Sequence, residues 1–203
     1  MNGAFSSPCA ELAARSYVAL VHHPVYDKQH QVVSTSVTNL DIHDIARSCC
    51  TYGVARYYVV HPVSAQRQLV QRILGYWDDG PGQQQNDFRR TALARVCVQC
   101  SMEQTIESIV DERGQQPMVV GTTARLSPSD RVFSAPALRT KLLDGTRPLL
   151  LVMGTGWGLT DDFMATVDGV LEPLQGQAPY NHLSVRSATA ILLDRLFAEE
   201  NRT

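Results

Sequence analysis

Short apolar runs alternate along the chain with segments whose apolar residues recur at helical spacing. The apolar runs predict β-strands at 16–23, 55–62, 95–100, 116–122, 148–154 and, with a weaker pattern, 168–173. The segments between them predict helices at 41–52, 64–77, 87–95, 102–113, 135–143, 159–166 and 183–198. Because short strands separated by helices are typical of parallel sheets, the pattern predicts an α/β fold with a mostly parallel sheet and helices on both faces.

Two of these helices differ in how many apolar faces they carry. The helix at 41–52 has one apolar stripe, formed by Ile42, Ile45, Ala46 and Cys49. Gly53 is placed to end this helix. The last helix has one stripe at Val185, Ala188, Leu192 and Leu196 and a second at Ala190, Leu193 and Phe197. One core rarely covers both stripes, so the second stripe predicts a contact with another chain.

The chain is long enough for one sizeable domain. Its 203 residues predict a single domain over 1–203, with a loose N-terminal segment at 1–15. A hairpin-like insertion is expected at 26–39, and the polar, glycine-containing run at 78–87 predicts an exposed loop.

Composition narrows the possible partners. A net charge of -2 excludes a uniformly basic nucleic-acid binder but leaves local clusters such as Arg89, Arg90 and Arg95, or Arg67 and Arg72. Five cysteines include only one CxxC, at Cys97 and Cys100, with no second pair for zinc, so we expect free thiols and no metal. No secretion signal or membrane-spanning run is present, and these features together favour the cytosol.

The stretch PLLLVMGTGWGLTDDF at 148–163 places three glycines directly after a predicted strand. Gly154, Gly156 and Gly158 are typical of a nucleotide-binding loop, although a tight strand-to-helix turn explains them as well. A nicotinamide-dinucleotide fold is excluded because the residues after Gly158 suffice for only one further strand and one helix. With the loop at 119–127 and the polar run at 172–182, the glycine loop would lie at the carboxyl edge of the sheet, where main-chain groups could hold an adenosine.

Three segments resemble motif regions of the SPOUT class of RNA methyltransferases, most closely a bacterial group of SAM-dependent RNA methyltransferases whose RNA substrate is unknown. They are GTGWGLT, EPLQGQAPYNHLSVRSATAILLDRL and TNLDIHDIARSCCTYGVARYYVV, and the resemblance extends from about Tyr17 to Phe197. It implies a C-terminal deep trefoil knot that forms an S-adenosylmethionine pocket, a homodimer with sites at the interface, and RNA as the methyl acceptor. The cofactor-binding residues that it implies are Thr122, Thr123, Gly154, Thr155, Gly156, Gly158, Leu171, Pro173, Tyr180, Asn181, His182, Leu183 and Ser184.

The same resemblance places Arg47 near the methyl acceptor and matches Asn39 to a polar residue that precedes this helix. His43, one turn before Arg47, is the third candidate on the acceptor side. An alternative for Arg47 is a surface ion pair with Asp44, three positions earlier on the helix. Ser184 is also expected to cap the last helix, and Arg186 could meet either a substrate phosphate or a partner subunit. The implied reaction is in-line methyl transfer to a ribose oxygen or a base nitrogen. A non-catalytic knotted protein that binds RNA or a protein partner is the alternative.

Overall fold

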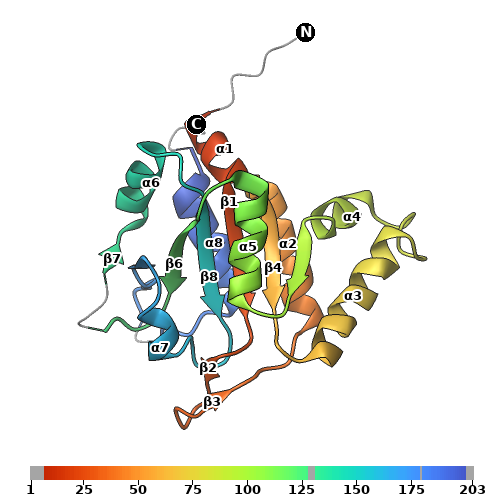
Figure 1. The fold of residues 1–203 in the computed structure, drawn as a ribbon, viewed down its shortest axis with the longest axis horizontal. Coiled ribbons are helices and arrows are strands. Elements are labelled where there is room, and N and C mark those ends of the chain that lie inside the picture. Colours follow the sequence, from red (N-terminus) through yellow and green to blue (C-terminus); the bar gives the residue numbers. More distant parts are fainter. Residues whose placement is uncertain (1–6, 128–130, 179, 200–203) are drawn as a thin grey trace.

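A parallel sheet of seven strands forms the centre of the computed structural model, which describes residues 7–127, 131–178 and 180–199 (Figure 1). Pro179, within the polar run at 172–182, lies outside the described residues. All strand pairs in this sheet are parallel, which confirms the predicted α/β fold. In the order β5-β4-β1-β8-β6-β9-β7, the strands are Val96–Gln99, Arg56–Val60, Ser16–Val21, Leu149–Gly154, Met118–Thr122, Gly169–Leu171 and Val132–Phe133.

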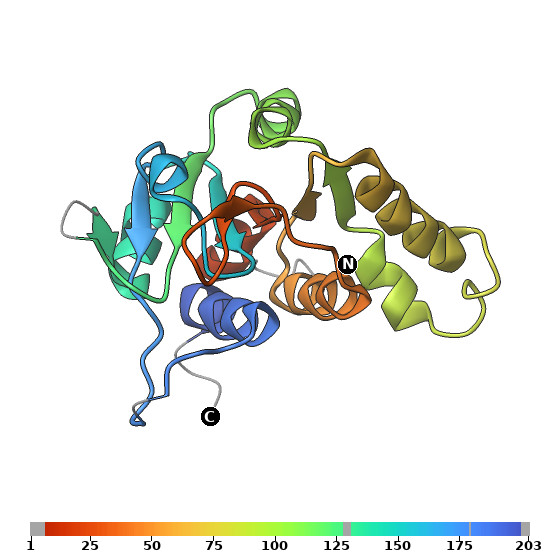
Figure 2. The ribbon, with the colours of Figure 1, turned by 90° about the horizontal axis from the view of Figure 1, so that it is seen from below.

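Helices cover both faces of the sheet, as the sequence predicts. Figure 2 shows α2 and α8 on one face and α5 on the other, while α3 and α4 lie beyond the β5 edge. A buried apolar cluster fills each face: one includes Ile42, Ile45 and Leu193, and the other includes Met102 and Ile109. The helices are α1 (Pro8–Ala14), α2 (Asn39–Tyr52), α3 (Ser64–Asp78), α4 (Asp87–Leu93), α5 (Met102–Arg113), α6 (Ala135–Leu143), α7 (Asp161–Met164) and α8 (Val185–Phe197).

The expected insertion after β1 is a hairpin, as predicted. Its strands β2 (Val25–Tyr26) and β3 (Val32–Val33) pair antiparallel. The hairpin is joined to the glycine loop, because the Trp157 amide donates to the Tyr26 carbonyl at 2.9 Å and the Tyr26 amide donates to the Gly158 carbonyl at 2.9 Å. The insertion therefore supports the loop that follows β8.

Two elements depart from the expectation. The segment at 1–15 is not loose over Pro8–Ala14: it forms α1, which Ser7 caps and whose Leu12 and Ala13 are fully buried. Residues 1–6 lie outside the described residues. The strand β7 was also not predicted, because two residues are too few to show an alternating pattern.

The expectation that the second stripe of the last helix contacts a partner chain is wrong. Leu193 is fully buried and Phe197 is only 6% exposed within the single chain. α8 packs against α1 and α6 as well as α2, so helices of the same chain cover more of it than the pattern suggested. The missing element in the prediction was α1. The stripe therefore carries no evidence for a dimer.

Cysteine thiols are free, as expected, with Cys49 buried and Cys9, Cys50, Cys97 and Cys100 half-buried. Within the described ranges no group of three or more His, Cys, Asp or Glu side chains is arranged to hold a metal ion. None of the helices described is long and apolar enough to cross a membrane.

Candidate functional site

A cavity of about 660 Å³ lies at the carboxyl edge of the sheet. Its walls come from the segments that follow β1, β6, β8 and β9. From β1 the sheet continues to β4 and β5 on one side and to β8 and the later strands on the other, so the cavity opens where the strand order reverses. Open α/β sheets bind their ligands at such a point, and the volume is within the range usual for small-molecule sites.

The glycine loop is a constrained turn and also a wall of this cavity. Gly156 and Gly158 have φ values of 59° and 107°, which side-chain-bearing residues rarely adopt. A Cβ on Gly156 would lie 2.8 Å from the carbonyl oxygen of Tyr26, whereas one on Gly158 would meet nothing within 4 Å. The loop can therefore be both a tight strand-to-helix turn and a ligand-binding loop, because the turn leaves open space beside the backbone of Gly158.

Most of the predicted cofactor-binding residues line the cavity, although they come from three distant segments. Those that line it are Thr122, Thr123, Gly154, Thr155, Gly156, Gly158, Asn181, His182, Leu183 and Ser184. Ser184 also caps α8, as expected, by accepting a hydrogen bond from the Ser187 amide at 3.2 Å. The structure thus brings the three predicted loops together.

Three predicted residues do not line the cavity. Leu171 is only 1% exposed and belongs to the core, Pro173 is half-buried elsewhere, and Tyr180 is 74% exposed with its ring against His182. Glu172 and Leu174 line the cavity instead. Glu172 and Leu174 alternate with Leu171 and Pro173, because successive side chains of an extended segment point to opposite sides. Cofactor binding by Leu171, Pro173 and Tyr180 stays a prediction.

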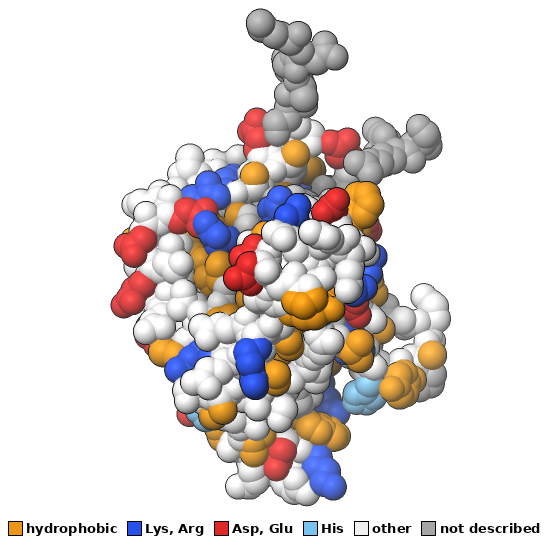
Figure 3. Space-filling view, turned by 90° about the vertical axis from the view of Figure 1, so that its right-hand side faces the viewer, with side chains coloured by type: hydrophobic (Ala, Val, Ile, Leu, Met, Phe, Trp, Pro, Cys, Tyr) orange, Lys and Arg blue, Asp and Glu red, His pale blue; other side chains and the backbone are white. Residues whose placement is uncertain are grey.

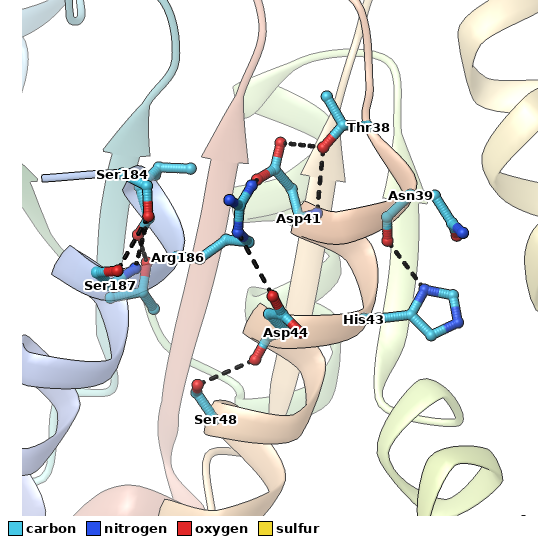
Figure 4. Close-up of polar contacts among 11 residues, drawn as sticks. Thr38, Asn39, Asp41, His43, Asp44, Ser48, Ser184, Arg186 and Ser187 are labelled. Carbon is cyan, nitrogen blue, oxygen red and sulfur yellow. Dashed lines mark hydrogen bonds and ion pairs between the residues drawn. The ribbon is translucent and has the colours of Figure 1, made fainter.

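An ion pair that the sequence analysis missed lies in the same cavity. Asp41, only 6% exposed, accepts hydrogen bonds from Arg186 Nη1 at 2.8 Å and from the Thr38 hydroxyl at 2.6 Å. Arg186 also contacts Asp44 at 3.4 Å, so it connects α8 to α2 (Figure 4). The Thr38-x-x-Asp41 spacing is typical of a helix N-terminus, where Thr38 caps α2. The spacing alone therefore gives no sign that Asp41 lies in a cavity wall.

The three predicted acceptor residues lie in a different hollow. Asn39, His43 and Arg47 share one side of α2 and line a hollow of about 500 Å³ bordered by α3 and α4. Figure 4 shows Asn39 and His43 leaving α2 on the side away from Arg186. The structure therefore brings these three together but does not place them in the cavity at the carboxyl edge of the sheet.

The alternative ion pair of Arg47 with Asp44 is not formed. Asp44 contacts Arg186 instead, and the Arg47 guanidinium makes no hydrogen bond or ion pair among the described residues. The first turn of α2 borders both spaces, since Thr38 and Asp41 line the cavity while Asn39 lines the hollow.

Two stacked histidines support the cavity wall from the sheet. His22 and His61 follow β1 and β4, their ring centroids are 5.4 Å apart, and both are buried. Burial lowers the pKa of His22 to about 4, and the neighbouring His61 acts in the same direction. His22 Nδ1 lies 3.1 Å from the Thr35 hydroxyl, which lies 2.5 Å from the Thr155 hydroxyl of the glycine loop. At neutral pH an uncharged His22 therefore belongs to the structure that holds this loop.

The fold is similar to that of solved methyltransferase structures. The solved structure of the SpoU methyltransferase AviRb from Streptomyces viridochromogenes, determined in complex with AdoMet, is similar with a TM-score of 0.53. The alignment covers 89% of this chain and 56% of that chain at 16% identity, so this likeness concerns the fold.

The family of this chain follows from its sequence relatives. Residues 15–198 match the family described as SAM-dependent RNA methyltransferase, and the chain belongs to that family. An uncharacterized protein of Aquifex aeolicus is 42% identical over 90% of this chain and 88% of its own length. A tRNA (guanine-N(1)-)-methyltransferase of Nitratidesulfovibrio vulgaris is 44% identical over 90% of this chain, which spans only 42% of that relative's length. The predicted membership of a SAM-dependent RNA methyltransferase family, the enzyme type and the S-adenosylmethionine cofactor are thereby confirmed, whereas the likeness to the solved structure concerns the fold alone.

Proposed function

We propose that this chain transfers the methyl group of S-adenosylmethionine to a ribose oxygen or a base nitrogen of an RNA. The observation that carries the proposal is the cavity itself. Three predicted loops of the chain form it, and Gly156 and Gly158, which have positive φ values, lie in its wall. The chain belongs to a family of SAM-dependent RNA methyltransferases. Its lining fits this cofactor: hydroxyl and amide groups such as Thr122, Thr155 and Asn181 suit the adenosine, and the open space beside Gly158 suits a flat ring.

Transfer RNA is the substrate class that we propose to test first. The support is the name of the Nitratidesulfovibrio relative, which acts on tRNA according to that name. The chain spans less than half of that relative, so the guanine N1 position is not carried over as the acceptor atom.

The proposed reaction is an in-line displacement. A bond forms between the acceptor atom and the methyl carbon, the bond from that carbon to sulfur breaks, S-adenosylhomocysteine leaves, and the acceptor loses a proton. When bound, the cofactor supplies an activated methyl group. The chain's part is to hold donor and acceptor in line, which can contribute several kcal/mol of the barrier.

Arg47, Asn39 and His43 are the residues that we propose for the acceptor side. In one chain they line the hollow and not the cavity, so Arg47 is best assigned to positioning the RNA. A homodimer with sites at the subunit interface, as the resemblance implies, would let the hollow of one chain serve the cavity of its partner. The dimer and the trefoil knot both stay predictions. For the dimer, the apolar side chains that remain exposed along α8 and just before it are Leu183 at 50% and Ile191 at 37%.

Incubation with isotopically labelled S-adenosylmethionine and separated RNA fractions tests this proposal. We expect label in the tRNA fraction, and resistance of the labelled linkage to alkaline hydrolysis would identify a ribose oxygen as the acceptor. Calorimetry on the same preparation checks that the cofactor binds. Cofactor binding without label in any RNA fraction would contradict the RNA acceptor, and absence of cofactor binding would contradict the cavity assignment.

A further inference from the structure

We infer that the hollow between α2, α3 and α4 binds a single-stranded segment of the RNA, with arginines on its phosphates and an aromatic ring against a base. This inference rests on the proposed function, because it names the surface by which the same enzyme would hold its acceptor. The ligand proposed for the hollow differs from the ligand proposed for the cavity, so an experiment can contradict one assignment without contradicting the other.

The charge of the hollow is the first observation. Arg47, Arg72 and Arg89 all line it, and none of the three has a carboxylate partner in the part of the chain that the structure describes. Asp44 also lines the hollow, but its carboxylate contacts Arg186. Asp87, the acid nearest in sequence to Arg89, contacts Arg90. Three unpaired guanidinium groups around one hollow favour an anionic ligand with more than one charged group.

This arrangement differs from that of arginines elsewhere in the molecule. Arg56 and Arg147 hold Glu112 and Asp168 at 2.8 and 2.9 Å, and Arg95 donates to the Val54 carbonyl. In a chain with a net charge of -2, unpaired positive charge gathered at one hollow is a local feature. Figure 3 shows the side of the molecule on the right of Figure 1, where basic side chains lie among hydrophobic and acidic ones without a single large basic block. The charge would therefore guide a short strand segment and not a long duplex.

Aromatic rings give the hollow its second recognition element. The Arg89 guanidinium lies 4.8 Å from the ring centroid of Trp77, and the Tyr76 ring stands edge-on to Trp77 at 5.3 Å. Trp77 is buried, so it fixes Arg89 in place, whereas Tyr76 is 41% exposed. An ordered arginine beside an exposed aromatic ring suits a phosphate next to a stacked base, the combination by which proteins bind single-stranded nucleic acid. An acidic peptide would use the arginines but would gain little from the ring.

The location of the hollow agrees with this ligand. Its lining begins at Asn39 and Leu40 in the first turn of α2, and neighbouring residues of the same turn line the cofactor cavity. Leu40 is 60% exposed and could contact a further base or sugar. A strand held in the hollow therefore lies beside a turn that also borders a cofactor cavity, and in the proposed homodimer it would continue toward the cavity of the partner chain.

Fluorescence anisotropy with a labelled, mixed-sequence RNA of about ten nucleotides tests the inference, with Arg72→Ala and Arg89→Ala as the first variants. Each should weaken binding about tenfold, the effect of losing a charged hydrogen bond to phosphate. Each should also reduce the slope of log affinity against log salt concentration by about 0.7. Tyr76→Leu should weaken binding by a similar factor, whereas Tyr76→Phe should bind as the wild type does because it keeps the stacking surface.

Arg90→Ala is the matched control, because Arg90 neighbours Arg89 on α4, pairs with Asp87 and does not line the hollow. It should change affinity less than twofold. Equal losses in Arg90→Ala and Arg89→Ala, wild-type binding in all variants, or equal binding of a polyglutamate of matched charge would each overturn the inference. Calorimetry with S-adenosylmethionine should show unchanged cofactor affinity in every variant. A different outcome is that the wild type binds the RNA and the hollow variants lose this binding, yet no RNA is methylated. That result would support the hollow as an RNA site and would contradict the proposed methyl transfer alone.

Discussion

The cavity and the hollow are built from different parts of the polypeptide. The cavity is walled by loops at the carboxyl ends of strands, with main-chain groups and hydroxyls such as Thr122 and Thr155. The hollow is walled by the sides of three helices, with arginine and aromatic side chains such as Arg72 and Tyr76. A backbone site suits a ligand of fixed shape, and a site of long charged side chains suits a flexible polyanion. By their chemistry the two spaces suit the small cofactor and the RNA strand that we propose for them.

This difference also determines which substitutions separate the two sites. A change in a loop backbone should affect the cavity alone, a side-chain truncation on α2, α3 or α4 should affect the hollow alone, and a change in the shared core should affect both.

Leu193→Glu should remove both sites together by unfolding the chain. Leu193 is fully buried on α8, a helix that packs against α1, α2 and α6, and an unpaired charge there should lower the free energy of unfolding by about 4 kcal/mol or more. Calorimetric or circular-dichroism melting would show this as a lost or strongly lowered transition, with neither cofactor nor RNA binding at moderate temperature.

Ile191→Glu is the matched control, since Ile191 lies two positions earlier on the same helix and is 37% exposed. It should melt within a few degrees of the wild type. The same variant tests the proposed dimer by sedimentation, where a shift to monomer is expected. A stable, fully folded Leu193→Glu protein would show that α8 is not held by its own chain.

Gly156→Val should abolish cofactor binding and spare the hollow. The added Cβ would lie 2.8 Å from the Tyr26 carbonyl oxygen, and a β-branched residue strongly disfavours the φ of 59°. We expect at least a hundredfold loss of S-adenosylmethionine affinity by calorimetry with unchanged RNA affinity by anisotropy. Gly145→Val serves as the control, because its Cβ would meet only ordinary contacts and it lies outside the cavity lining. Normal cofactor affinity in Gly156→Val would remove the glycine loop from the site.

Arg47→Ala should separate methyl transfer from cofactor binding. Arg47 is exposed, makes no ion pair in the described structure and lies on the hollow side of α2, so its truncation should spare the fold and the cavity. If it positions the acceptor, kcat/KM for RNA should fall about a hundredfold while S-adenosylmethionine affinity stays within twofold. Arg47→Lys should restore little, since an ammonium lacks the planar two-point grip on a phosphate. Transfer at the wild-type rate in Arg47→Ala would place the acceptor elsewhere.

The sequence predicted the cavity better than the hollow, and the reason is physical. Loops that follow parallel strands must meet at one edge of the sheet, so glycines after β8 and polar residues after β6 and β9 could be brought together from their positions in the sequence. Even there the sequence did not show which side chains would face the cavity: Glu172 and Leu174 line it and Leu171 and Pro173 do not, because a shift of one residue along an extended segment turns the side chains to the opposite side.

The hollow depends on where helices pack, and periodicity alone does not give this. Arg47, Arg72 and Arg89 are far apart in sequence, and each by itself has the appearance of an ordinary charged residue on a solvated helix face. The same limit explains the error about the last helix. Its second stripe was correctly identified as apolar, but the elements that cover it include α1, a short helix in a segment expected to be loose.

The smallest predicted effect is a pH dependence of stability that comes from His22 and His61. It concerns the cavity, because both histidines contact Thr35, which lines the cavity. His22 has its pKa lowered from an ordinary 6.5 to about 4 in the folded chain. Between these values the unfolded chain binds a proton that the folded chain does not, so the free energy of unfolding falls as the pH falls through this window. Between pH 7 and pH 5.5 the loss from His22 should be about 1 kcal/mol, and His61, whose pKa burial also lowers, adds in the same direction. Denaturant titrations at both pH values would measure this, and His22→Gln should lose about 1 kcal/mol less than the wild type over the same interval. Equal losses in the two proteins would show that His22 takes up no proton on unfolding and is already charged within the cavity wall.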